Sequence, residues 1–452
     1  MYPCASYLFL CTSEPHDFIF PAASLRRVSD CFLAVKEINI FMRPIRSMFC
    51  LVIAFVFAIL AGPAALAQDT DFFVYAGTYT GFKWVHHSKP YGLGESQSKG
   101  IYVSRFNAAT GELSEPQLAA EVINPSFLTI SPNHRFLYAL SEDPLSVGPP
   151  LDHSSYVSAF AIDSVTGKLR LLNKAPASGT STCHISMDRT GKYVFMANFG
   201  SGSVSVIRVK EDGSLGELTS FIQNVGHSVA PIQSEPHPHW IGPSPDNRFV
   251  IVSDLGMDKV LIFRFDAATG MLSPPGPPSV SVYPGGGPRH FTFDPAGKFG
   301  YQLSEMSGVV DVLAWDAAQG TLTTIQRAQT VPHDFFGGNH SAEIEILPNG
   351  KFLYESNRRT LSETERAPDT IGVFAIDPKQ GTLTPVEQSL SGGVMPRNFK
   401  IDPTGKYLLA ANQISNNIVL FAIDSNTGRL SNTGKEIKVD TPVCLQFVPA
   451  GR

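Results

Sequence analysis

The segment "GGGPRHFTFDPAGKF", which begins at Gly285, places an arginine and a histidine side by side at the start of an apolar stretch. An arginine can hold a carboxylate or phosphate, or stabilise a negative oxygen, through its guanidinium fork. A histidine can exchange a proton near neutral pH. A strand that opens with Arg289 and His290 therefore either ends at a solvated edge or lines a polar pocket.

Related segments recur along the chain, each with a strand, a turn of the Pro-x-Gly-Lys kind and a second strand. Six full copies begin at Pro125, Thr182, Pro238, Pro288, Ser341 and Pro396, and a shortened one begins at Pro442. Hairpins with a tight glycine turn, such as "YVSAFAIDSVTGKLRLL" from Tyr156, alternate with them. Four strands in each repeat of roughly 50 residues predict an all-β fold, a seven-bladed β-propeller of four-stranded antiparallel blades.

The two ends of the repeat region complement each other. Residues 442–449 look like an inner strand without its partner, and residues 72–79 look like a second strand without an inner one. We expect the two to pair in one blade, because this pairing closes the ring and removes its open sheet edges. Residues 69–452 should then form a single propeller domain.

One mouth of the predicted channel is chemically richer than the other. The inner strand and the second strand are antiparallel, so the start of the first and the end of the second meet at this mouth. Residues there are polar and vary from blade to blade, whereas the opposite turns are nearly constant. Long connecting loops open there too, which favours a binding pocket. Candidate substrate-binding residues at this mouth are His237, Asp254, His290, Glu343, Asn357, Arg397 and Gln413.

The segments "GPRHFTFDP", "LSEMSGVVDV", "AEIEILPNGKFLYESNR" and "PRNFKIDPTGKYLLAANQIS" carry a family resemblance. Over residues 69–452 the chain resembles the seven-bladed propeller lactonases, which include a bacterial type of 6-phosphogluconolactonase and the fungal carboxymuconate lactonizing enzyme. The resemblance implies an enzyme that acts on a small lactone or organic acid. It also implies four catalytic residues, which fall on His239, Arg289, Glu305 and Arg358, with His237 of "EPHPHW" as an alternative to His239.

These residue types suit the hydrolysis of a lactone by water. His239 or Glu305 would act as general base, and the arginines would stabilise the oxyanion or bind an acidic group. The chain has no Gly-x-Ser-x-Gly elbow and no metal-type spacing of ligands, so we expect neither a serine nucleophile nor a metal or other cofactor. The Arg289–Glu305 pair could instead be a structural ion pair. If it is catalytic, we expect the loss of Arg289 to impair catalysis far more than stability.

Two other functions stay open at this point. The chain could be a non-catalytic propeller that binds a ligand or a protein, because the fold alone implies no function. It could also be a lactonizing enzyme of the carboxymuconate type. The net charge of −5 and the lack of a basic block argue against nucleic acid as a partner.

The N-terminal region resembles an export signal. In "MRPIRSMFCLVIAFVFAILAGPAALAQ", a basic start precedes an apolar run and a small-residue cleavage site. We interpret residues 1–41 as an extension and 42–67 as a signal peptide, although an uncleaved membrane anchor is an alternative. This interpretation predicts a periplasmic or secreted monomer that begins at Gln68 and has no stable membrane span. It would keep only Cys183 and Cys444, which we do not expect to form a disulfide.

Overall fold

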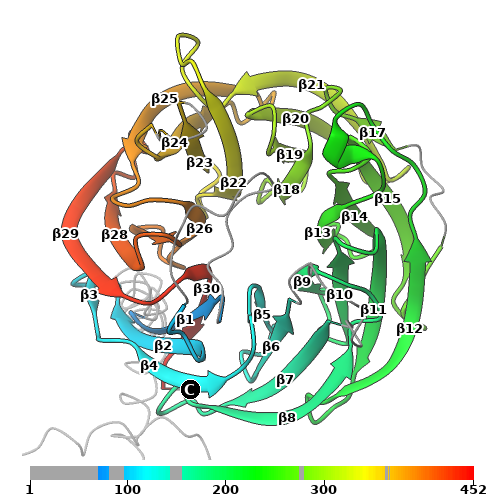
Figure 1. Ribbon diagram of the computed structural model, residues 1–452, viewed down its shortest axis with the longest axis vertical. Coiled ribbons are helices and arrows are strands. Elements are labelled where there is room, and N and C mark those ends of the chain that lie inside the picture. Colours follow the sequence, from blue (N-terminus) through cyan, green and yellow to red (C-terminus); the bar gives the residue numbers. More distant parts are fainter. Residues whose placement is uncertain are drawn as a thin grey trace, which may run out of the picture. The chain divides into compact units, whose positions relative to one another are not determined.

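The computed structural model describes residues 70–80, 96–142, 155–273, 279–361, 365 and 367–451. Within these ranges, antiparallel strands form seven sheets arranged as the blades of a ring (Figure 1). The predicted seven-bladed β-propeller is therefore confirmed, and its strands belong to one compact unit, Asp69–Arg452. The predicted extension and signal peptide lie outside the described residues. Within the described part of the chain, no helix has the length and apolar character needed to cross a membrane.

The strands of each blade follow one another from the channel outwards. Blade 1 contains β30 (Pro442–Pro449), β1 (Asp71–Thr78), β2 (Gly100–Asn107) and an outer strand in two parts, β3 (Glu112–Leu113) and β4 (Gln117–Glu121). Blade 2 contains β5 (Leu128–Ile130), β6 (Phe136–Ser141), β7 (Tyr156–Ile162) and β8 (Leu169–Pro176). Blade 3 contains β9 (Thr182–Met187), β10 (Tyr193–Asn198), β11 (Ser203–Val209) and β12 (Leu215–Gln223), and the short 3-10 helix η1 (Pro231–Gln233) follows it.

The remaining blades repeat this arrangement. Blade 4 contains β13 (Pro238–Pro243), β14 (Phe249–Asp254), β15 (Lys259–Asp266) and a split outer strand, β16 (Met271–Leu272) and β17 (Val280–Ser281). Blade 5 contains β18 (Pro288–Phe293), β19 (Phe299–Ser304), β20 (Val309–Asp316) and β21 (Thr321–Gln329). Blade 6 contains β22 (Gly338–Ile346), β23 (Phe352–Thr360), β24 (Thr370–Ile376) and β25 (Leu383–Leu390). Blade 7 contains β26 (Pro396–Ile401), β27 (Tyr407–Asn412), β28 (Asn417–Ile423) and β29 (Leu430–Lys438).

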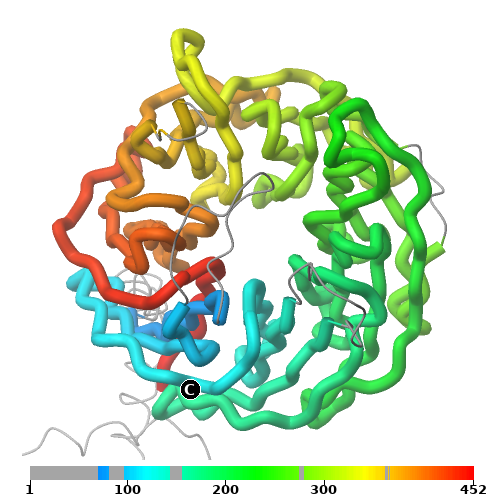
Figure 2. The backbone as a smooth tube through the Cα atoms, viewed as in Figure 1, coloured from blue at the N-terminus to red at the C-terminus, as the bar shows by residue number. Residues whose placement is uncertain are grey.

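The ring closes through strands from opposite ends of the chain. Strand β1 pairs antiparallel with β30, from Phe72 opposite Pro449 to Thr78 opposite Pro442. Figure 2 shows this as a blue segment beside a red one. The predicted closure is confirmed, and the last inner strand is an integral part of blade 1. This pairing leaves no open gap between the first and last blades at which another chain could add a strand.

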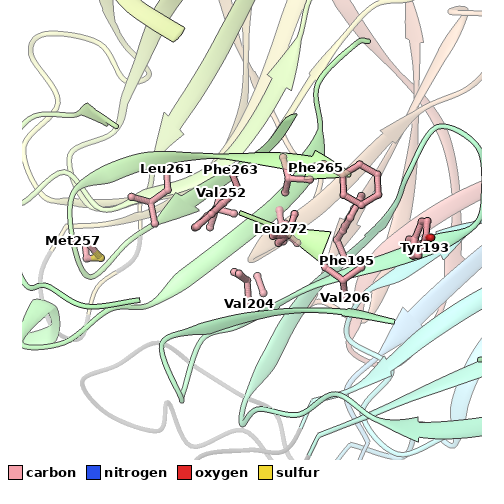
Figure 3. Packing of buried hydrophobic residues seen from close by; sticks show 13 residues of the cluster. Tyr193, Phe195, Val204, Val206, Val252, Met257, Leu261, Phe263, Phe265 and Leu272 are labelled. Atoms are coloured by element: carbon pink, nitrogen blue, oxygen red, sulfur yellow. The ribbon is translucent and has the colours of Figure 1, made fainter. Parts of the chain in front are cut away.

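The hydrophobic core lies between neighbouring blades, because each blade presents an apolar face to the next. Between blades 3 and 4, Phe195 and Val206 pack with Val252 and Phe263, all fully buried (Figure 3). Successive side chains of a pleated strand point to opposite faces of the sheet, so every second residue contributes to one of these apolar faces. Equivalent clusters between the other blades hold the channel-lining strands at fixed positions around the ring.

A tyrosine in several second strands ties its blade to the next one. The Tyr138 hydroxyl donates to the Gly213 carbonyl at 2.9 Å, and Tyr301 donates to Gly381 at 2.9 Å. Gly213 has a φ of +84°, and a Cβ there would lie 2.3 Å from the Phe136 ring. The tight glycine turns of the sequence therefore act as hairpin turns and also as acceptors for the preceding blade.

Candidate active site

A β-bulge at the mouth end of several inner strands positions the site residues. The ladder shifts between Pro238 and Trp240, between Pro288 and His290, and between Pro396 and Asn398. The residues left unpaired are His239, Arg289 and Arg397. A bulge interrupts the strict alternation of side-chain directions. Arg289 and His290 consequently both contact residues of β22 in blade 6.

Two arginines from neighbouring blades share one carboxylate. Glu305 follows β19, and its Oε2 lies 2.9 Å from Arg289 Nε while its Oε1 lies 3.1 Å from Arg358 Nη2. Backbone carbonyls fix both guanidinium groups, since Arg289 donates to Ala342 at 2.6 Å and Arg358 donates to His340 at 2.7 Å. All three charged side chains are almost fully buried. The predicted Arg289–Glu305 pair is present, and it is part of a triad.

The triad is electrostatically unbalanced. Burial lowers the pKa of Arg289 and of Arg358, and the charge of Glu305 opposes this shift. Because arginine keeps its proton in proteins, two cations face one anion here. Within the described residues, Arg358 Nη1 is buried and has no hydrogen-bond partner. A negative oxygen of a ligand would satisfy both the charge and this donor.

The burial of the triad changes one expectation from the sequence. Removing one member of a buried ion pair typically costs about 3–5 kcal/mol, because the partner is left without its counter-charge. Arg289 is only 2% exposed and Glu305 only 3%. Substitutions of these residues should therefore lower stability as well as activity, and a catalytic role has to be separated from a structural one by a matched control.

Three histidine rings meet beside the triad. The ring of His290 lies 5.3 Å from that of His239 and 5.4 Å from that of His184, between centroids. All three rings are buried. Burial lowers the pKa of each well below its usual value, and nearby Arg289 strengthens the effect. The histidines are therefore neutral at neutral pH, as a proton acceptor must be.

The structure distinguishes the two histidines of "EPHPHW". The ring of His237 stacks on Phe199 at 4.4 Å, and its Nδ1 donates to the Phe199 carbonyl at 2.8 Å. His239 instead contacts His290, and its Nδ1 is buried without a hydrogen-bond partner among the described residues. This geometry favours His239 over His237 as the histidine that meets a substrate.

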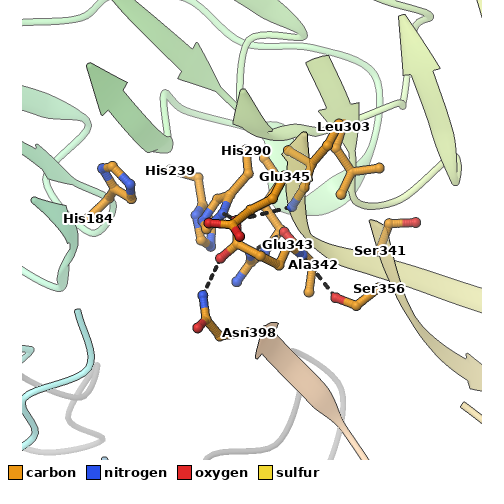
Figure 4. Close-up of polar contacts among 12 residues, drawn as sticks. His184, His239, His290, Leu303, Ser341, Ala342, Glu343, Glu345, Ser356 and Asn398 are labelled. Carbon is orange, nitrogen blue, oxygen red and sulfur yellow. Dashed lines mark hydrogen bonds and ion pairs between the residues drawn. The ribbon is translucent and has the colours of Figure 1, made fainter. Parts of the chain in front are cut away.

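Glu343 joins the histidines to the next blade. It lies in β22 beside a ladder irregularity between Ser341 and Ile344, and its Oε1 is 2.9 Å from His290 Nδ1. Its Oε2 accepts a hydrogen bond from Asn398 of blade 7. Figure 4 shows Glu343 between His290 and Asn398. Burial raises the pKa of Glu343 to about 7, although Lys400 opposes the shift.

A second polar cluster lies at the same mouth and includes two residues, Tyr79 and Glu142, that were not among the predicted site residues. Arg397 Nη2 donates to the Tyr79 hydroxyl at 3.1 Å, and Tyr79 donates to Glu142 Oε2 at 2.9 Å. Glu142 follows β6 in the dipeptide Ser-Glu, and Glu305 follows β19 in a second copy of the same dipeptide. This repetition in the sequence indicated that Glu142 occupies the equivalent place in its own blade. Tyr79 follows β1, where no pattern in the sequence indicated its contacts.

Three other predicted binding residues are engaged within or beside their own blades. Asp254 is fully buried and accepts hydrogen bonds from Asn224 and from the His237 backbone. Asn357 is fully buried and accepts hydrogen bonds from Asn339 and Ser341, which favours a structural role. Gln413 is buried, and its backbone N–H donates to the Met395 carbonyl. Their part in binding a substrate stays a prediction.

The channel continues from the histidine cluster towards the opposite turns. A cavity of about 760 Å³ occupies this part, and its lining includes His184, Trp240, Glu343 and Asn398 together with the turn residues Pro132, Asp188, Pro245 and Asp294. Across the ranges that the structure describes, no group of three or more His, Cys, Asp or Glu side chains is arranged to hold a metal ion. Cys183 and Cys444 are both buried and free.

Comparisons with known proteins identify the family of the chain. Residues 73–447 match the family model described as "Lactonase, 7-bladed beta-propeller". The chain is 34% identical to 6-phosphogluconolactonase of Bacillus subtilis over 379 residues, which cover 84% of this chain and 99% of the relative. It is 30% identical to the solved periplasmic gluconolactonase of Pseudomonas aeruginosa, with a TM-score of 0.74, 84% of this chain covered and 100% of the other. The chain belongs to the seven-bladed β-propeller lactonase family.

Proposed function

We propose that the protein is an exported hydrolase that opens a small lactone derived from a sugar or a carboxylic acid. Water attacks the lactone carbonyl, a neutral histidine takes the proton, and the arginines stabilise the oxyanion. The observation that carries this proposal is the buried Arg289–Glu305–Arg358 triad beside neutral imidazoles. It supplies a positive site for a developing negative oxygen and a proton acceptor next to it.

The contacts of Glu305 favour one role among those the sequence left open. One of its carboxylate oxygens lies against Arg289 and the other against Arg358, so protonating it would weaken both ion pairs. Glu305 is thus better suited to hold the arginines in place than to accept a proton from water. The role of general base then falls to a histidine, and His239 is the one that the family resemblance implies.

The charge of the mouth favours a substrate or product with an acidic group. Within the triad, two guanidinium groups, those of Arg289 and Arg358, face the single carboxylate of Glu305. Opening a lactone releases a carboxylate, which an unpaired guanidinium donor can bind. The same surplus of positive charge would attract a lactone that already carries a carboxylate or a phosphate.

Export rests on two independent supports. The segment 42–67 has the sequence of a signal peptide. A relative at 30% identity is a periplasmic gluconolactonase by its own description. A mature N-terminus at Gln68, determined by mass spectrometry of the exported protein, would agree with the proposal. A mature protein that retains residues 1–41 would contradict it.

The activity can be tested with the purified protein and a panel of lactones, followed by acid release in a pH-stat. The panel contains glucono-lactone with and without a 6-phosphate, a lactone derived from an aromatic acid, and an acyl-homoserine lactone. We expect turnover of at least one sugar- or acid-derived lactone. Arg358→Lys should lose this turnover, because lysine keeps the positive charge but lacks the guanidinium group that makes bidentate contacts. If no lactone of the panel is hydrolysed above the rate in buffer, the proposal fails.

A further inference from the structure

His290 and Glu343 form a buried pair that the family resemblance does not assign to catalysis. His290 comes from β18 of blade 5 and Glu343 from β22 of blade 6. The two side chains are 3% and 9% exposed, and Nδ1 lies 2.9 Å from Oε1. A carboxylate that contacts one imidazole nitrogen fixes which tautomer the ring adopts.

The other contacts of Glu343 determine the direction of this hydrogen bond. Its Oε1 also accepts the Ile344 backbone N–H at 3.0 Å, and its Oε2 accepts an N–H of Asn398. Both oxygens therefore act as acceptors, the pattern of an ionised carboxylate. In this state Nδ1 of His290 carries the hydrogen and donates it to Glu343. Nε2 is left with a lone pair, which is what a base requires.

The free nitrogen of His290 lies in the histidine cluster. Nε2 is buried and has no hydrogen-bond partner in the part of the chain that the structure describes. Buried polar atoms nearly always bond to protein, to ordered water or to a ligand. The centroid of the His290 ring lies 5.3 Å from that of His239, the histidine expected at the substrate.

We propose that His290 is the base that activates water, and that Glu343 is the residue that positions it. This inference rests on the proposed lactone hydrolysis. His239 lacks an equivalent support, because its Nδ1 is buried without a partner among the described residues, so its imidazolium would face Arg289 with no carboxylate in contact. The imidazolium of His290 would be stabilised by Glu343, as in other pairs of a base and an orienting carboxylate.

The reaction balances with these groups alone. As the water oxygen bonds to the lactone carbonyl carbon, its proton passes to His290 Nε2 and the carbonyl oxygen becomes negative beside an arginine. The bond from that carbon to the ring oxygen then breaks. The alkoxide that leaves takes the proton back from Nε2, which yields a hydroxy acid and restores the neutral imidazole.

Charged and titratable neighbours of this pair set its pH behaviour. Arg289, Arg358 and Arg397 disfavour the His290 imidazolium, whereas Glu305 and Glu343 favour it, and His184 and His239 lie against the ring. Lys400, Arg289 and Glu345 act on Glu343 from blades 7, 5 and 6. Loss of the Glu343 charge alone should therefore make His290 harder to protonate.

The test compares His290→Gln, Glu343→Gln and His239→Gln in the full protein. We expect His290→Gln to lower kcat by roughly 10²-fold or more. Glu343→Gln keeps an oxygen opposite Nδ1 but removes the charge, so kcat should fall at least about tenfold and the acid limb of kcat should move to lower pH. The matched control is Glu387→Gln, an acid of the outer strand β25 in the same blade, which pairs with Arg429 and should leave both kcat and the limb unchanged.

Two results would overturn the role proposed for His290 but would leave the proposed lactone hydrolysis standing. The first is an His290→Gln protein that keeps kcat within about threefold of wild type while His239→Gln loses it. The second comes from wild-type protein with ¹⁵N-labelled histidine, in which the ring shifts identify the tautomer of His290. We expect Nδ1–H above neutral pH, and a hydrogen on Nε2 instead would overturn the inference even if a variant fails to fold.

Discussion

Glu305→Gln gives the sharpest test of the arginine triad. The substitution keeps the shape of the side chain but leaves Arg289 and Arg358, both almost fully buried, without their shared carboxylate. Breaking a buried ion pair in this way costs about 3–5 kcal/mol of unfolding free energy. With an unfolding entropy of about 2.1 cal/mol/K per residue, a unit as long as 69–452 should lose roughly 4–6 °C in Tm.

The catalytic effect of the same substitution should be larger than its effect on stability would imply. Without Glu305 the guanidinium groups repel each other and leave the position where the oxyanion forms. Loss of one oxyanion donor lowers turnover by about 10²–10³. We therefore expect kcat to fall by that factor at 25 °C, where the variant is still folded.

A matched control separates the two effects. Asp311 is also a buried acid of blade 5, and its Oδ1 lies 2.9 Å from Arg327 Nε away from the inner strands. Asp311→Asn should lower Tm but leave kcat within about twofold of wild type. A triple variant, Arg289→Met with Glu305→Leu and Arg358→Met, removes all three buried charges, so it should recover stability and not activity. Wild-type turnover in Glu305→Gln, or recovered activity in the triple variant, would refute a catalytic triad and leave a structural one.

Three further outcomes test the fold and its charges. Deletion of 441–452 should cause aggregation, because it removes β30 and exposes the edge of β1; a soluble truncated protein with unchanged Tm would contradict the closure. Tyr301→Phe should cost about 1–2 kcal/mol in urea unfolding, since the buried Gly381 carbonyl loses its donor, and an unchanged midpoint would show that this bond adds nothing. Because burial lowers the pKa of His184 below its unfolded value of 6.5, the unfolded chain takes up the proton first as pH falls. Below pH 6.5 wild type should lose stability relative to His184→Gln by about 1.4 kcal/mol per pH unit, and a pH-independent difference would refute this.

The blades could be predicted from sequence because each is built from local patterns. The strand, turn and strand of "PRHFTFDPAGKFGYQLSE" specify β18 and β19, and the glycine hairpins specify the outer strands. Closure of the ring by pairing of residues 72–79 with 442–449 could be predicted because each end of the repeat region has one strand whose partner is missing. The Arg289–Glu305 pair could also be predicted from the sequence, because both residues belong to one hairpin.

Contacts between blades could not be predicted in the same way. His290 meets Glu343, and Glu343 meets Asn398, across separations of 53 and 55 residues. Which residues meet there depends on the radius of the ring and the tilt of its blades, and no single strand encodes either quantity. The Tyr79–Arg397 contact joins residues 318 apart for the same reason. The sequence therefore indicated the correct mouth and only part of its contacts.

The bulges explain why chemistry is concentrated at one position of the repeat. Strands β13, β18 and β26 all begin with a proline, which cannot donate to the ladder and is tolerated at a strand start. The next residue is unpaired in the ladder in each case. Its side chain therefore does not have to follow the alternation that buries apolar side chains between blades. His239, Arg289 and Arg397 occupy this position. A polar residue there interrupts none of the apolar faces between blades, and this freedom allows each blade to present a different functional group to the same mouth.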